Sequence, residues 1–177
     1  MDILASGPLT ERHLTYFGAI THGFARHELL MQRIMAHAMG ADDSSTIQLT
    51  KTMSFSQKRD ALLALLRHRD VPLDQIDAIR DHLKLPSRLR ALRDDICHSD
   101  WTAGVAMDSI QPAWIFNQPP TIKPIHATAG AGTFFEDDDD RSEYSLGELA
   151  RIAENLAENH ERFHDYVSEV RLIERKR

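Results

Sequence analysis

The chain has 177 residues, 42% of them hydrophobic and 27% charged, and its formal net charge is −6. These values are typical of one globular domain, and the net charge argues against broad, nonspecific binding of nucleic acid while remaining compatible with a small basic site. No apolar run approaches the roughly 20 residues of a membrane span, no basic leader is present, and the single Cys97 excludes an internal disulfide. We therefore expect a cytoplasmic protein with no membrane contact.

The first predicted element is a helix from Thr10 to about Met39. Thr10 is suited to capping its N-terminus, and Glu11 suits the first turn. Apolar residues recur at intervals of three, four and seven and predict one buried stripe, made of Phe17, Ile20, Phe24, Met31 and Met35.

Glu28 falls on this apolar stripe, four residues after Phe24 and three before Met31. A carboxylate that faces a core is costly unless it is paired. Arg93 is a natural partner, and such a pair would fix the guanidinium for phosphate binding. The alternative is that Glu28 lies at the edge of the stripe and points to water.

Two helices follow a break at residues 40–45. Ser54 and Gln57 have the spacing of a capping box for a helix that reaches about Arg69. A turn at residues 70–72 then leads into a third helix, whose buried face is predicted to be Leu73, Ile76, Ile79 and Leu83.

Pro86 interrupts the third helix, and Ser87 is placed to cap a fourth helix that ends near His98. Helical periodicity is then lost from residue 101 to 135, where β-prone pieces at 113–116 and 121–125 indicate a hairpin or an irregular excursion.

Ser145 and Glu148 form the capping-box pattern of a final helix that reaches about Ile173. The prediction is therefore a single all-α domain over residues 1–177. It is an antiparallel bundle of about five helices, with a short irregular or β-hairpin insert over about 101–141 before the last helix.

A basic segment runs from residue 80 to 93 and carries one acid, Asp81. We interpret it either as a solvated helical face or as a phosphate-binding rim, and its candidate substrate-binding residues are Lys84, Arg88 and Arg90. At its end, Arg93 and His98 are separated by four residues. Arginine can clamp a phosphate through two hydrogen bonds, and histidine transfers protons near neutral pH.

This arrangement resembles the HEPN superfamily, in which the penultimate helix of a bundle ends in Arg, four to six residues, then His. The matching residues are Arg93 and His98, with polar Asp94 after the arginine and Trp101 soon after the histidine. The order of helices agrees over most of the chain, whereas the segment 101–141 has no counterpart in the minimal bundle.

The resemblance implies a metal-independent endoribonuclease, or an RNA-binding relative without catalysis. His98 would transfer protons at the ribose 2′-hydroxyl or the leaving 5′-oxygen, and Arg93 would hold the scissile phosphate. The product would be a 2′,3′-cyclic phosphate, and no metal or nucleotide cofactor would be needed. It also implies RNA as substrate, a homodimer with a shared cleft, and a toxin–antitoxin or phage-defence setting with an antitoxin protein as partner.

The spacing itself sets a constraint. Five residues at about 100° each place Arg93 and His98 about 140° apart around an ideal helix. A joint site therefore needs His98 at a fraying helix end, a long reach by Arg93, or a dimer whose clefts combine the two chains. Asp94 lies four residues before His98 and could orient its imidazole.

Ordinary structural roles remain as alternatives. Arg93 could form an ion pair with a neighbouring acid, and His98 could cap the helix C-terminus. Cys97 is interpreted as a small packing residue. His160 and His164 lack a matching acid cluster, so no metal site is predicted. The alternative function is a non-catalytic helical module that binds RNA or a partner protein.

Overall fold

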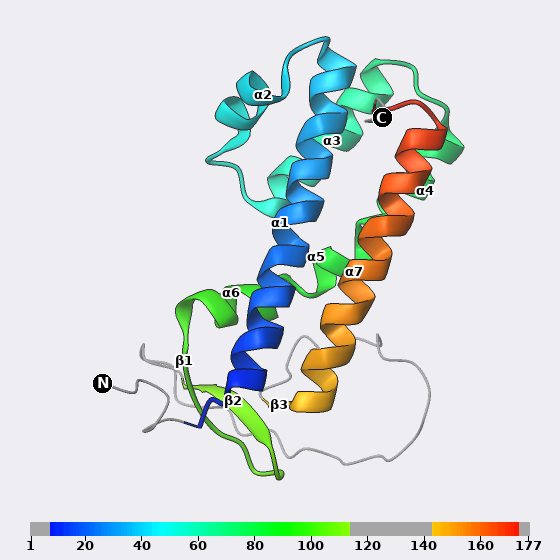
Figure 1. The fold of residues 1–177 in the computed structure, drawn as a ribbon. Helices are drawn as coiled ribbons and strands as arrows, with labels where there is room; N and C mark the ends of the chain where they lie inside the picture. Colours follow the sequence, from blue (N-terminus) through cyan, green and yellow to red (C-terminus); the bar gives the residue numbers. More distant parts are fainter. Residues whose placement is uncertain (1–7, 114–142, 174–177) are drawn as a thin grey trace.

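The computed structural model describes residues 8–113 and 143–173, which form seven helices and a small antiparallel sheet (Figure 1). The chain is thus mostly helical. The helices are α1 (Glu11–Met39), α2 (Asp43–Thr50), α3 (Phe55–His68), α4 (Leu73–His82), α5 (Lys84–Arg88), α6 (Arg90–His98) and α7 (Leu146–Glu169). The strands are β1 (Asp100–Ala103), β2 (Ser109–Ala113) and β3 (Tyr144–Ser145).

Three predicted helix starts are confirmed by their caps. The side chains of Thr10, Ser54 and Ser145 each accept a hydrogen bond from the backbone N–H three residues later. In α3 and α7 the predicted capping boxes are complete, because the side chains of Gln57 and Glu148 accept hydrogen bonds from the backbone N–H groups of Ser54 and Ser145. These local signals were sufficient because each requires only residues within one turn.

Two predictions about helix boundaries are wrong. The segment expected to be a break contains the start of α2, with Asp42 capping the helix through the backbone N–H of Ser45. Ser87 does not cap the helix that follows Pro86. It lies inside α5, and its hydroxyl donates to the carbonyl of Leu83 at 2.6 Å. The predicted five helices are therefore seven in the described ranges.

The predicted stripe of α1 is confirmed, since all five of its residues are buried. On α4, Ile76 and Ile79 are buried but Leu73 is 71% exposed, so the predicted buried face begins one turn later. One continuous cluster of buried apolar side chains draws on α1, α3, α4, α6, α7 and the sheet.

The two longest helices, α1 and α7, run parallel, which corrects the expectation of an antiparallel bundle (Figure 1). Gly23 lies against Leu156, and four residues further along both helices His27 contacts His160. A Cβ added at Gly23 would lie 3.3 Å from the Cβ of Leu156, so the glycine permits this close approach. The sheet lies at the end of the bundle where α1 begins, and α7 starts directly after β3, so both helices start at the same end (Figure 1).

A hairpin, one of the two alternatives expected for the insert, is formed by β1 and β2, and it ends where the first predicted β-prone piece begins. Strand β1 pairs with β2, with Trp101 opposite Pro112, and β2 pairs with β3, with Ile110 opposite Tyr144. The Trp101 ring centroid lies 4.7 Å from that of Phe17, which seats the sheet on the first turns of α1. Of the β-prone pieces predicted at 113–116 and 121–125, only residue 113, the last of β2, lies within the described residues.

Within the two described ranges, no helix has both the length and the apolar character needed to cross a bilayer.

Candidate functional site

The predicted Arg–His motif lies on the short helix α6, which packs against α1 through its buried residue Leu92. His98 is the last residue of α6, and Ser99 after it is extended, with φ −104° and ψ 148°. The imidazole is exposed at this helix end. A position at the end of the helix is one of the three conditions under which Arg93 and His98, about 140° apart around the helix, could form a joint site. Cys97, predicted to be a packing residue, is exposed instead.

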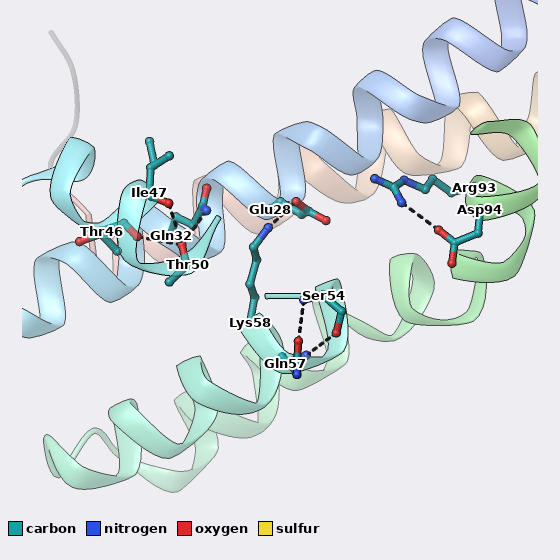
Figure 2. Close-up of polar contacts among 10 residues, drawn as sticks. All are labelled: Glu28, Gln32, Thr46, Ile47, Thr50, Ser54, Gln57, Lys58, Arg93 and Asp94. Carbon is teal, nitrogen blue, oxygen red and sulfur yellow. Dashed lines mark hydrogen bonds and ion pairs between the residues drawn. The ribbon is translucent and has the colours of Figure 1, made fainter. Parts of the chain in front are cut away.

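Arg93 is half-buried, and its Nη1 donates a hydrogen bond to Asp94 Oδ1 at 2.8 Å (Figure 2). The hydrogen bond to Asp94 raises the pKa of Arg93 above its usual value, against partial burial, which lowers it, and the nearby Glu28 carboxylate adds to the increase. The guanidinium points toward the part of α1 that carries Glu28. Arg93 is therefore a positioned, permanently charged group.

Glu28 does not pair with Arg93. Its carboxylate accepts a hydrogen bond from Lys58 Nζ on α3 at 2.7 Å, with side chains 24% and 6% exposed respectively (Figure 2). Lys58 was missed, although a signal existed: it lies three residues after Phe55 and four before Leu62, on the apolar stripe of α3. Helices α1 and α3 are therefore joined by an ion pair between two charged residues, each of which lies on the apolar stripe of its helix.

His98 receives no fixed partner in the part of the chain that the structure describes: neither hydrogen bond nor ion pair joins it to Arg93 or Asp94. Asp94 is engaged with Arg93 rather than with the imidazole. Asp95, three residues before His98 and on the same side of α6, was not singled out from the sequence. Partial burial, together with the neighbouring Asp94 charge, raises the pKa of the Asp95 carboxyl.

The three predicted substrate-binding residues separate into two locations. Lys84 and Arg88 line a pocket of about 520 Å³ between α3, α4 and α5. Arg90 lies elsewhere, where its Nη1 donates to Ser56 Oγ at 3.2 Å. Arg93 and His98 are not part of the pocket lining. The basic segment therefore does not form one continuous rim beside the Arg–His motif.

A second group of titratable side chains lies between α1 and α7. His27 is fully buried and places Nδ1 2.8 Å from the Gly23 carbonyl oxygen, and its ring contacts that of His160. The Nδ1 of buried His160 makes no hydrogen bond, and Glu161 Oε1 lies 3.7 Å from it. Among the described residues, no three His, Cys, Asp or Glu side chains are grouped to hold a metal ion.

Because His160 is buried, we expect the free energy of unfolding to depend on pH. Burial, reinforced by the charge of Arg26, lowers the pKa of His160 from 6.5 to about 4. His160 therefore takes up a proton near pH 6.5 in the unfolded chain but only near pH 4 in the folded chain. Between these values we expect acidification to lower the free energy of unfolding by about 2 kcal/mol through this residue.

Urea denaturation at a series of pH values measures this effect in wild type and in His160→Leu. The variant should show a clearly shallower loss of stability between pH 6.5 and 4. The matched control is His22→Leu, at an exposed position of α1. An identical pH dependence for wild type and His160→Leu would contradict the lowered pKa of His160 in the folded chain.

Comparison with protein-family models, with curated proteins and with solved structures gives no match for this chain.

Proposed function

We propose that this chain is a metal-independent endoribonuclease of HEPN type. The observation that supports this most directly is the geometry of α6. The helix ends at an exposed His98, five residues after Arg93, whose guanidinium is held by Asp94 at 2.8 Å. A permanent cation that can bind a phosphate and an accessible group that can transfer a proton are thus carried by one short helix.

In the proposed reaction, His98 removes the proton from a ribose 2′-hydroxyl, or donates one to the leaving oxygen. The 2′-oxygen attacks the adjacent phosphorus, the bond from phosphorus to the 5′-oxygen breaks, and that oxygen takes up a proton. Arg93 binds the non-bridging phosphate oxygens and stabilises the charge that develops on them. The products are a 2′,3′-cyclic phosphate and a free 5′-hydroxyl.

We further propose that the active form is a homodimer. Arg93 and His98 diverge by about 140° around α6, so one chain does not present both groups in one direction. In a symmetric dimer, each cleft can combine Arg93 from one chain with His98 from its partner. A toxin or phage-defence role, with a protein antitoxin as inhibitor, remains part of this proposal.

A second candidate function is a non-catalytic RNA-binding module. It is favoured by one observation: the pocket lined by Lys84 and Arg88 excludes both Arg93 and His98. In that case RNA would bind at the pocket, and α6 would have only a structural role.

The deciding experiment incubates the full chain with end-labelled transfer and messenger RNA in EDTA. The proposal predicts cleavage with 2′,3′-cyclic phosphate ends, and none by the double variant Arg93→Ala/His98→Ala. Circular dichroism and size-exclusion chromatography establish that this variant is folded and has the wild-type oligomeric state. RNA binding without cleavage by wild type would favour the binding module, and equal cleavage by wild type and double variant would exclude α6 as the site.

A further inference from the structure

The pocket between α3, α4 and α5 has an unusual concentration of positive charge. Its nine lining residues include five cations and one carboxylate, which are Arg59, Arg67, Arg80, Lys84, Arg88 and Asp60. The chain as a whole carries a net charge of −6, so this is a local reversal of sign. A volume of about 520 Å³ is in the range of pockets that bind small ligands.

Helical spacing explains how the charges come together. On α3, Arg59, Leu63 and Arg67 are four residues apart and share one face. Across from them, Arg80, Lys84 and Arg88 repeat the same spacing along α4 and α5. Each row advances by about 5.4 Å per helical turn, so the cations of the second row are about one turn apart, and Arg59 and Arg67, with Leu63 between them, are about two turns apart.

The two rows run in opposite directions. Arg59 Nη1 donates to Ser87 Oγ at 3.2 Å, which places the start of α3 beside the end of α5. Arg67 is the penultimate residue of α3, next to the turn into α4, whereas Arg80 lies in the last turn of α4. The floor between the rows is formed by Leu63 and Leu83, both buried. The cations therefore surround a shallow hollow from two sides.

Three of the five pocket cations form ion pairs with acids whose side chains are exposed. Arg59 pairs with Asp60, Arg80 with Asp77, and Lys84 with Asp81 at 2.7 Å. All three acids have side chains that are more than 60% exposed, at 66%, 62% and 65%. Exposed pairs of this kind contribute little and exchange readily. The pocket lining itself holds five cations and one carboxylate, so positive charge predominates there.

We infer that this pocket binds closely spaced phosphoryl groups, such as those of a nucleoside polyphosphate or of consecutive nucleotides in an RNA strand. Several charges distributed over two rows match a ligand with several phosphates better than a single phosphate. Guanidinium groups, which form four of the five cations, bind phosphate oxygens through paired hydrogen bonds. The inference does not rest on the proposed ribonuclease activity, since the lining excludes Arg93 and His98.

The test is calorimetric titration of the full chain with three probes: inorganic tripolyphosphate, ATP, and a hexaribonucleotide without terminal phosphates. The pocket variant is Arg67→Gln/Arg88→Gln, and both positions are exposed. The matched control, Arg12→Gln/Arg162→Gln, removes the same charge at exposed positions outside the pocket. Circular dichroism establishes that both variants are folded.

We expect the pocket variant to bind about tenfold more weakly or worse, and the control to bind as wild type does. Pocket-dependent binding of tripolyphosphate or ATP would identify a small phosphorylated ligand. Pocket-dependent binding of the hexaribonucleotide alone would identify RNA as the source of the phosphates. Absence of binding for all three probes, or equal weakening in pocket and control variants, would overturn the inference.

Discussion

Replacing His98 with alanine is expected to lower the rate of RNA cleavage by about 10²- to 10⁴-fold, the usual effect of losing a general acid or base. Arg93→Ala should lower it by about 10²- to 10³-fold, because it removes the charge that stabilises the phosphorane-like transition state. Both rates are measured under single-turnover conditions in EDTA. His22→Ala, an exposed position on α1, is the control with wild-type activity.

A mixing experiment separates a shared cleft from a site within one chain. We expect Arg93→Ala and His98→Ala each to be nearly inactive, and co-refolding the two variants to yield a mixed dimer. If each cleft takes its arginine and histidine from different chains, one of the two clefts in that dimer is intact. We then expect about a quarter of wild-type activity at equal amounts of the two variants, because about half of the dimers are mixed. No recovery, with mixed dimers shown by native mass spectrometry, would exclude the shared cleft.

The second large effect is expected at the ion pair between α1 and α3. Glu28→Gln leaves Lys58 with a side chain only 6% exposed and no full counter-charge. Removing one partner from a buried pair costs about 3 to 5 kcal/mol, and the partial exposure of Glu28 suggests the lower end of that range. Lys58→Met should cost less, because Glu28 can reach water.

Urea denaturation of Glu28→Gln, Lys58→Met and the double variant tests this asymmetry. The double variant should be more stable than the sum of the two single effects implies, since it leaves no unpaired buried charge. The matched control is Glu158→Gln, whose partner Arg162 lies at 3.1 Å on an exposed surface and whose loss should cost less than about 1 kcal/mol. A Glu28→Gln effect as small as that of the control would contradict the prediction.

Features that depend on a few neighbouring residues were predictable from the sequence. The caps at Thr10, Ser54 and Ser145 and the buried stripe of α1 were all recognisable. Each follows from periodicity or from hydrogen bonds within one turn of helix. The same local reasoning failed at α2 and at Ser87, where weak apolar periodicity and a proline concealed helical turns.

Which charged groups contact each other depends on how the helices pack, and sequence patterns do not reveal it. Glu28 was recognisable as a carboxylate that needs a partner, but a stripe pattern does not say which helix lies opposite, and Lys58 rather than Arg93 occupies that place. The rows containing Arg59 and Arg80 are separate in sequence and form one pocket only because α3 and α4 fold back on each other. The parallel packing of α1 and α7 was equally hidden, because helix direction depends on the path of the connecting chain. Sequence patterns report which face of an element is buried, and packing then selects its neighbour.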